Sequence, residues 1–482
     1  MTILLTGRGV VGFRDADAVL VKDERIVAIG RASEFEGDIE VRRHDGFLSA
    51  PRHDHHFHPF GYVGAGARPN LKNASDFGGL RERLRSAVAR LRPGEALMAN
   101  RLDDEALAEL RLPSRWELDA MVAETPVLLN RYCGHIAVAN SAALALVGLG
   151  HHPDGILREQ EIGPVSTAVG ARQAPLTPEV VETALVGLAS LGLGTITAIV
   201  SAGDPLWCEV PDELATLIAV APKVPLDFEV LVIASERSRL EMAASLLKDA
   251  GRNVRFAGWK DFADGALGGR TAALHEPFSD DGGNRGIMRL LRPHADEMAE
   301  TCLALGGRVA LHAIGDRAND AVLDLYQDLM LSGADEGQLR IEHASVLTPA
   351  ARERMANLGI SASVQPSFIT SEVTWLGKRL GSRVDHTYAL AAMEDEGIWL
   401  LGGSDCPVET PNPWEGMAAA QVGGLSLDSG YRLYGSPFQI GAPAHLLVLD
   451  RDPMRPGVAE TKVLASYRHG RPLQLMPPIP FV

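Results

Sequence analysis

Residues 51–439 of this chain alternate between short apolar runs and longer amphipathic stretches. The apolar runs have the length of strands, and the stretches between them carry apolar residues at helical spacing. Strands and helices that alternate in this way predict a parallel α/β sheet or barrel. The predicted strands are residues 53–59, 96–99, 126–130, 195–200, 228–233, 254–260, 308–312, 339–343, 361–365 and 399–405.

The predicted strands outnumber the eight of a barrel, so part of the chain must form an insertion. We place this insertion at about residues 65–175, where two of the predicted strands lie. Helices are predicted at Leu80–Leu91 and Pro178–Leu191, the second with Thr177 as its N-cap.

Both ends of the chain show short strands joined by turns. Residues 18–22 and 25–30 form a hairpin-like pattern, and similar strands return at residues 444–450 and 462–471. We expect residues 1–50 and 440–482 to pair into one small composite β domain, because each alone is too small to bury a core. The hairpin and residues 446–449 should then share one sheet.

Composition adds limits on partners. The 482 residues are 46% hydrophobic, and their formal net charge of −16 argues against nucleic acid and anionic membranes. No apolar run approaches the ~18 residues of a membrane span, and the N-terminus lacks a basic leader. The cysteines form no CxxC pair, so we expect reduced thiols in a cytoplasmic protein: Cys133, Cys208, Cys302 and Cys406. We also expect a small-molecule substrate and a homo-oligomer, with a dimer as the leading state.

The stretch from His53 to Pro59 contains four histidines. Because side chains alternate along a strand, His56 and His58 should point to the same side. Two imidazoles on one side of a strand can bind one divalent ion. The alternative is a histidine cluster on the surface without a ligand.

Four further polar side chains stand at the ends of later predicted strands: Lys260, His312, His343 and Asp405. In a (β/α)8 barrel these ends form one rim, so the side chains should converge with His56 and His58. Imidazoles plus one carboxylate suit Zn²⁺ or another divalent ion. Taken alone, His312 or His343 would more often be a hydrogen-bonded barrel histidine than a ligand.

Lys260 does not fit a metal site as an ammonium. An N6-carboxylysine, formed with CO₂, would be an anionic ligand that can bridge two ions. The alternative is an unmodified lysine paired with Asp261 or Asp264.

Several motifs resemble the amidohydrolase superfamily, in particular its YtcJ-like branch, which includes N-substituted formamide deformylases. The motif Asp54-x-His56-x-His58 is similar to that of its first strand. Other similar motifs are residues 134–141, 260–272, 312–318, 341–344 and 403–408. The sequence departs from the family at Pro51-Arg52, at the short stretch 431–440 and at Ala444-His445.

The resemblance implies a metal-dependent hydrolase, with a TIM-type (β/α)8 barrel at residues 51–439 and a β-sandwich made from both termini. It implies one or two zinc ions held by His56, His58, His312 and His343, with Lys260 as a further ligand. Asp405 would be ligand and proton shuttle, and His343 would also be catalytic. Candidate substrate contacts are His135, Arg270 and Trp375, for each of which a structural role fits as well.

The implied reaction is hydrolysis of a C–N bond in an amide, formamide or cyclic amide by metal-activated hydroxide. One alternative keeps the metal site but acts on a lactone, a carbamate or a phosphoester. Another is a barrel that binds a ligand without turnover.

Overall fold

An eight-stranded parallel sheet forms the centre of the computed structural model, which describes residues 2–203, 210, 212–435 and 437–480. Its order is β18-β17-β16-β15-β14-β13-β12-β7. A bridge between Phe57 and Cys406 brings its two edges together, so the sheet is a nearly closed barrel. Its strands are β7 (Arg52–Phe57), β12 (Leu193–Ser201), β13 (Asp227–Ile233), β14 (Val254–Phe262), β15 (Arg308–Ala313), β16 (Leu339–His343), β17 (Ser361–Val364) and β18 (Leu400–Gly402). The predicted barrel class is therefore confirmed.

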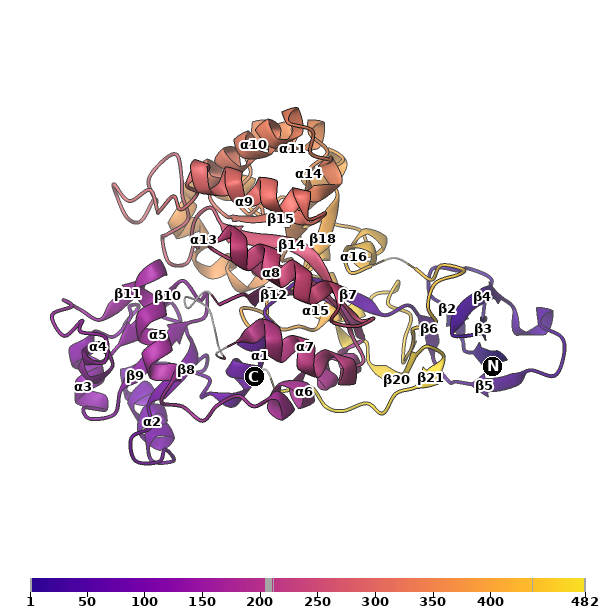
Figure 1. Ribbon diagram of the computed structural model, residues 1–482, viewed down its shortest axis with the longest axis horizontal. Helices are drawn as coiled ribbons and strands as arrows, with labels where there is room; N and C mark the ends of the chain where they lie inside the picture. The colour runs from indigo at the N-terminus through magenta and orange to yellow at the C-terminus, as the bar shows by residue number, and fades with distance from the viewer. Residues whose placement is uncertain (1, 204–209, 211, 436, 481–482) are drawn as a thin grey trace.

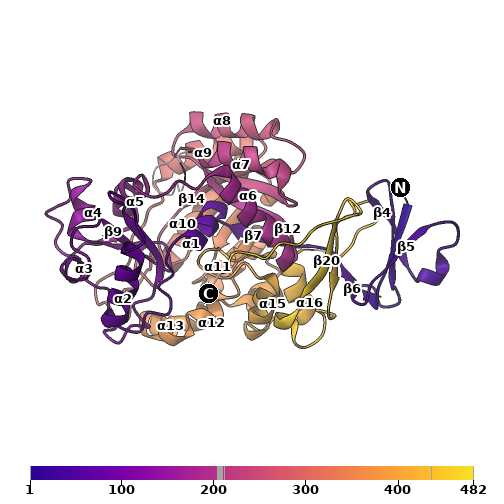
Figure 2. The same ribbon diagram turned by 90° about the horizontal axis from the view of Figure 1, so that it is seen from below.

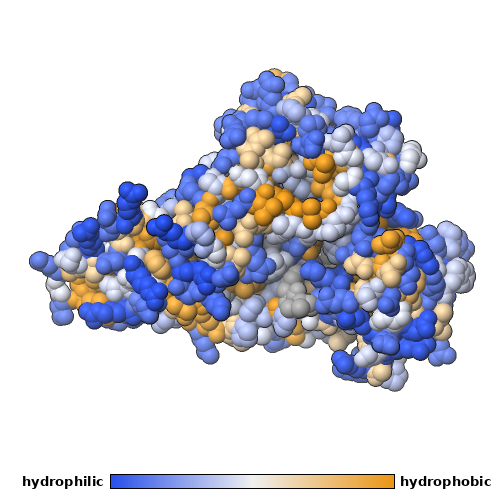
Figure 3. Space-filling view, turned by 180° about the vertical axis from the view of Figure 1, so that it is seen from behind, coloured by the Kyte–Doolittle hydropathy of each residue, from blue (hydrophilic) through white to orange (hydrophobic). Residues whose placement is uncertain are grey.

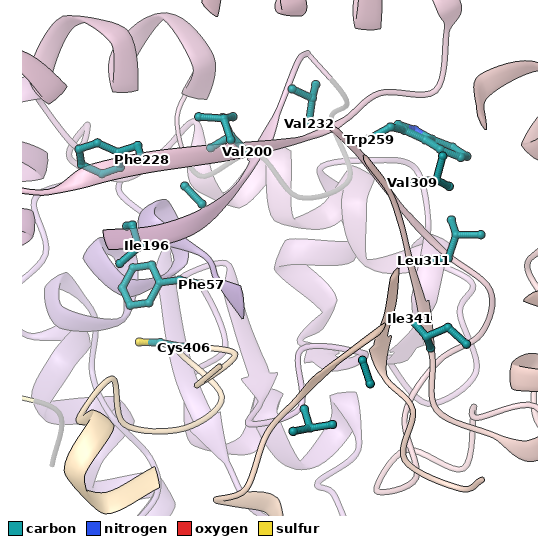
Figure 4. Packing of buried hydrophobic residues seen from close by; sticks show 14 of the residues in the cluster. Phe57, Ile196, Val200, Phe228, Val232, Trp259, Val309, Leu311, Ile341 and Cys406 are labelled. Carbon is teal, nitrogen blue, oxygen red and sulfur yellow. The ribbon is translucent and has the colours of Figure 1, made fainter. Parts of the chain in front are cut away.

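Helices surround this barrel (Figure 1). Val309 and Leu311 of β15 pack with Ile341 of β16 in the outer core (Figure 4), so alternation turns His312 toward the barrel interior. The helices are α1 (Pro59–Ala67), α6 (Pro178–Gly187), α7 (Glu213–Val220), α8 (Arg237–Lys248), α9 (Arg292–Ala304), α10 (Asp316–Leu331), α11 (Pro349–Asn357), α12 (Phe368–Ser371), α13 (Val373–Leu380), α14 (Leu390–Asp395), α15 (Pro413–Val422) and α16 (Leu427–Leu433).

A second sheet, of order β11-β10-β9-β8, lies beside the barrel in the part of the chain predicted as an insertion. Figure 1 shows it at the left, at the opposite end of the molecule from the N-terminus. Its elements are α2 (Phe77–Val88), β8 (Leu97–Leu102), α3 (Arg115–Met121), β9 (Val127–Arg131), β10 (Ile136–Ala139), α4 (Ser141–Ala145), β11 (Ile156–Arg158) and α5 (Ile162–Gly170). The predicted insertion bounds of 65–175 stay a prediction.

The two termini form a small β-sandwich. One sheet has the order β4-β3-β1-β5 and the other β2-β6-β19-β20-β21. Figure 2 places the C-terminal β20 next to N-terminal strands. The strands are β1 (Thr2–Thr6), β2 (Gly9–Val10), β3 (Ala18–Lys22), β4 (Arg25–Gly30), β5 (Glu40–Arg43), β6 (Phe47–Ser49), β19 (Leu446–Leu449), β20 (Val463–Arg468) and β21 (Arg471–Pro472).

One expectation about this sandwich is wrong. The hairpin β3–β4 and strand β19 do not share a sheet: β19 pairs with β6, and β3 pairs with β1. The two sheets instead pack face to face, with Leu5 and Val19 from one and Leu446 and Val448 from the other in the same apolar cluster. Each of the two sheets buries one face against the other in this way. A single sheet would have no second sheet to cover its apolar face.

The surface gives two further observations. In the residues that the structure describes, no helix is long and apolar enough to cross a membrane. Seen from behind, apolar residues gather over the middle of the molecule, with mostly hydrophilic surface toward both ends (Figure 3).

Cys133, Cys302 and Cys406 are free thiols, and Cys208 lies outside the described residues.

Candidate active site

Two histidines near the end of the first barrel strand meet one carboxylate that follows the last. The Nε2 atoms of His56 and His58 each lie 3.2 Å from Oδ1 of Asp405. Strand β7 ends at Phe57, so His58 reaches the carboxylate from the N-cap of α1 and not from the strand. The two imidazoles nevertheless converge, as the sequence predicts.

His343 completes a set of three metal-competent side chains. One ligand atom each from His56, His343 and Asp405 lies within 4.8 Å of the other two. Two imidazole nitrogens and one carboxylate oxygen suit zinc or a similar divalent ion, so these residues fit the implied metal.

The backbone turns two of these side chains to their positions. His343 would share the outer face of β16 with Ile341 if alternation continued. Its φ of 73° breaks the alternation, and Asp405 has a φ of 53°. A left-handed backbone costs about 1–3 kcal/mol at a non-glycine residue and is concentrated at functional sites.

His312 lies beside this set. Its ring centroid is 4.5 Å from that of His343, but its Nε2 lies 2.9 Å from the carbonyl oxygen of Gly265. Asp264 supports this loop by accepting hydrogen bonds from the backbone N–H groups of Ile314 and Gly315. His312 is therefore a neighbour of the set of three, not a member.

Lys260 lies at the inner face of β14. Its Nζ is 3.6 Å from the centroid of the Phe262 ring and donates a hydrogen bond to the carbonyl oxygen of Asp261. Burial lowers its pKa to about 8. The Lys260 amine thus contacts an aromatic ring and a backbone oxygen. It does not pair with the carboxylate of Asp261 or Asp264, the alternative that the sequence offered.

A cavity of about 180 Å³ opens over these residues. The barrel contributes His56, His58, His312, His343 and Asp405 to its lining. The inserted sheet forms much of the opposite wall, with Asn100, Arg101, Asn130, Arg131, Tyr132 and His135. Its volume is below the about 300–1,000 Å³ typical of sites for drug-sized ligands, which favours a small substrate.

Comparison with known proteins identifies the family. A family model described as the amidohydrolase family matches residues 46–429. The chain belongs to this family. YtcJ of Bacillus subtilis (strain 168), which carries the name of an amidohydrolase, is 32% identical over 64% of this chain. That match covers 60% of the length of YtcJ.

Two longer matches agree with this assignment. An N-substituted formamide deformylase from Arthrobacter pascens is 24% identical over 94% of this chain and 93% of its own. A solved structure of an uncharacterized metal-dependent hydrolase from Pyrococcus horikoshii OT3 superposes with a TM-score of 0.75. It is 25% identical and covers 95% of this chain and 99% of its own. The amidohydrolase described here is thus a hydrolase of a metal-dependent superfamily.

A buried carboxylate that the sequence reasoning missed orients the first histidine. Glu342 Oε2 lies 2.5 Å from Nδ1 of His56, and its Oε1 accepts a hydrogen bond of 2.5 Å from Nε of Arg340. Burial raises the pKa of Glu342, but Arg340 and His56 outweigh it and hold the pKa well below the usual value. The sequence feature that could have indicated Glu342 is the alternation on β16, which puts Arg340 and Glu342 on one face of the strand.

Asp54 joins the first and last strands beneath the site. Its Oδ1 accepts from the backbone N–H of His56 and of Ser404, and its Oδ2 accepts from the Ser404 hydroxyl. Burial raises the pKa of Asp54 to about 6. In this amidohydrolase the segments that carry His56, Glu342 and Asp405 are therefore tied together by contacts between protein groups.

The three candidate substrate contacts lie in different places. His135 lines the cavity. Arg270 lines a second cavity and forms an ion pair of 3.0 Å with Asp280. Trp375 is 3% exposed and packs in an apolar cluster that includes Leu267. The structure brings only His135 to the site, because Arg270 and Trp375 already have partners elsewhere.

Proposed function

We propose that this amidohydrolase hydrolyses the C–N bond of a small amide, formamide or cyclic amide, with one divalent ion held by His56, His343 and Asp405. When bound, such an ion polarises a carbonyl group and lowers the pKa of a water molecule. Zinc suits the donor set, and His58, in contact with Asp405, would complete it. Support for an amide substrate comes from the formamide deformylase among its relatives.

The observation that carries the mechanism is the position of Asp405. Its carboxylate lies between two imidazoles and lines the cavity, with 13% of the side chain exposed. Burial raises its pKa, but His56 and His58 outweigh it and hold the pKa well below the usual range. Asp405 is therefore ionised near neutral pH, as a group that accepts a proton must be.

The proton balance follows from this position. As water adds to the carbonyl carbon, Asp405 takes one of its protons, and it returns that proton to the departing nitrogen when the C–N bond breaks. The products are a carboxylic acid and an amine.

His343 keeps its Nδ1 against Oε1 of Gln365 at 2.6 Å, and burial lowers its pKa to about 3, so it stays neutral and suited to hold a metal ion.

The test is Asp405→Asn, which keeps the shape and one oxygen but cannot carry the proton. We expect it to keep most of its metal and to lose about a hundredfold or more in turnover. Metal per chain is measured by elemental analysis, and Asp428→Asn, at an exposed ion pair with Arg432, is the matched control. Near-normal turnover of an amide by Asp405→Asn would exclude it as the proton carrier.

A substrate panel tests the bond. It contains a formamide, a cyclic amide, a lactone, a carbamate and a phosphoester. Turnover of the lactone or phosphoester without turnover of either amide would contradict the C–N assignment. Metal-loaded protein that turns over no member would instead indicate a barrel that only binds a ligand.

A further inference from the structure

The wall that the inserted sheet contributes to the cavity is rich in polar side chains. Nδ1 of His135 lies 3.1 Å from Oε2 of Glu159. Nη1 of Arg101 donates to the carbonyl oxygen of Pro407 at 3.0 Å. Since Pro407 follows Asp405 by two residues, this hydrogen bond holds the wall next to the proposed metal site.

Arg131, the last residue of β9, lies in the same wall and has donors without acceptors. Its side chain is 1% exposed, and its Nε donates to Oδ1 of Asp104 at 2.6 Å. Among the described residues, no oxygen atom accepts a hydrogen bond from its Nη1 or Nη2. The Cys133 thiol beside the guanidinium group is only a weak acceptor. Charged donors of this kind are costly to bury without an acceptor, so these two nitrogens indicate a missing partner.

The hydroxyl group of Tyr132 is a second buried donor of this kind. In the part of the chain that the structure describes, it has no hydrogen-bond partner. The guanidinium carbon of Arg131 lies 4.4 Å from the centroid of the Tyr132 ring, so the two side chains are in contact. Burial holds the pKa of Tyr132 well above its usual value, and the hydroxyl therefore keeps its proton and can donate. Tyr132 also lines the cavity.

Gly268, in the loop after β14, lies against both of these groups. A Cβ on Gly268 would be 2.5 Å from Nη1 of Arg131 and 3.1 Å from the hydroxyl oxygen of Tyr132. The unpartnered donors therefore converge near one point, which glycine leaves free of a side chain. A carboxylate suits this point, because it only accepts hydrogen bonds and two of its oxygens can pair with the N–H groups of one guanidinium.

We propose that Arg131 and Tyr132 bind a carboxylate group of the substrate, so that the enzyme acts on amides that carry an acid group, such as N-formyl or N-acyl amino acids. Nη1 and Nη2 of Arg131 donate to this carboxylate, and the Tyr132 hydroxyl donates to the same group. Asp104 is a positioning residue, because it holds Nε and leaves the two Nη atoms for the ligand. This assignment, which rests on the proposed amide hydrolysis, names the substrate class. The carboxylate takes no part in breaking the C–N bond, so the proton balance at Asp405 is unchanged.

The test compares formamides of equal shape in the metal-loaded, full-length enzyme. N-formyl-β-alanine carries the carboxylate, and N-(3-methylbutyl)formamide has an isopropyl group in its place. N-formylglycine and N-formyl-4-aminobutyrate, each with its isopropyl counterpart, vary the distance between the acid and the scissile bond. The measured quantity is the ratio of kcat/KM for the acid to kcat/KM for its neutral counterpart. We expect a ratio of about ten to a hundred for the chain length that fits, the usual effect of hydrogen bonds to a charged group.

Tyr132→Phe separates contact with the ligand from a structural role. It removes a hydroxyl that has no partner among the described residues, so stability against urea should stay the same or rise. The preference for the acid should nevertheless fall by about tenfold. Tyr467→Phe is the matched control, because the Tyr467 hydroxyl lies 2.9 Å from Nε2 of His44 in the sandwich. This control should lose stability and keep the preference.

Two further variants act on the guanidinium group. Arg131→Lys keeps a positive charge for Asp104 but loses the paired Nη atoms. Gly268→Ala places a methyl group where the carboxylate would lie. Both should lower kcat/KM for the acid much more than kcat/KM for its neutral counterpart.

Two results would contradict the carboxylate site while amide hydrolysis stands. One is a wild type that hydrolyses the neutral formamides as well as the acids at every chain length. The other is a preference for the acid that both Tyr132→Phe and Arg131→Lys retain. Failure of the wild type to hydrolyse any amide, acid or neutral, with turnover of a lactone or phosphoester, would overturn the proposed function and the carboxylate site together.

Discussion

Glu342→Gln tests how far the proposed metal site depends on a residue that would not touch the ion. The substitution keeps the shape of the side chain and removes its charge. Glu342 is fully buried and contacts Nδ1 of His56 on one side and Nε of Arg340 on the other. A glutamine can donate to Nδ1 as well as accept from it, so the tautomer that leaves the Nε2 lone pair for a metal is no longer imposed.

Two magnitudes follow from these contacts. Removal of the partner that orients a ligating histidine typically weakens metal binding about 10–100-fold, which corresponds to about 1.4–2.8 kcal/mol. The change also leaves Arg340, which is 0% exposed, without its counter-charge. Breaking a buried ion pair in this way costs about 3–5 kcal/mol of folding stability. We therefore expect a loss of both affinity and stability.

The assay is competition between the protein and a chelating dye for zinc, together with urea unfolding of the metal-free protein. Glu241→Gln is the control, because Glu241 pairs with Arg237 on an exposed helix face and should cost less than about 1 kcal/mol. Unchanged zinc affinity in a folded Glu342→Gln protein would refute the argument that Glu342 sets the tautomer of His56.

Three further predictions concern other parts of the molecule. Lys260→Met should keep one bound ion per chain, measured by elemental analysis; loss of the ion, restored by a short carboxylic acid, would instead indicate N6-carboxylysine. Burial raises the pKa of Glu372 to about 8, so the folded state holds its proton more tightly than the unfolded chain and stability falls as pH rises from about 4.5 to about 8. Urea titrations at pH 5 and pH 8 measure this fall in stability, and Glu372→Gln should abolish it. An equal fall in wild type and variant would contradict the prediction. Deleting residues 440–482 should give insoluble protein although no proposed ligand is lost, and a soluble, active truncation would show that the sandwich is dispensable.

The barrel could be predicted because its strands are buried on both faces and stand out as apolar runs between amphipathic helices. Polar residues at the ends of such apolar runs, such as His312 and His343, differ from the rest of the run and can therefore be recognised in the sequence. The pattern does not say which strands pair, so the sheet partners of the terminal hairpin were misassigned. The last strand was predicted too long, since β18 ends at Gly402. A Cβ on Gly403 would lie 2.7 Å from the backbone N of His56, so the chain passes close to the first strand there.

The hydrogen-bond partners around the proposed metal site were hard to predict from the sequence. Glu342 lies in the family-like motif of residues 341–344. Its role, however, depends on pairing with His56, which comes from a strand far away in the sequence. Glu159 depends on how the inserted sheet lies against the barrel, and no local pattern encodes that. The surroundings of Arg270 and Trp375 could not be predicted for the same reason: Arg270 pairs with Asp280, and Trp375 shares an apolar cluster with Leu267, both in loops whose paths only the folded structure shows.

Two of the departures from the family pattern contact each other in the structure. Arg52, in place of the usual glycine, is fully buried, and its guanidinium carbon lies 3.9 Å from the centroid of the Tyr431 ring. Its Nη2 donates to the Tyr431 hydroxyl at 2.8 Å and to the carbonyl oxygen of Ala50 at 2.7 Å. Tyr431 begins the abbreviated stretch 431–440, so the longer side chain at one position packs where the chain is shortened at the other. Because β7 runs from Arg52 toward His56, this contact lies at the end of the strand opposite the proposed ligand. The two departures therefore affect the packing at that end of the strand.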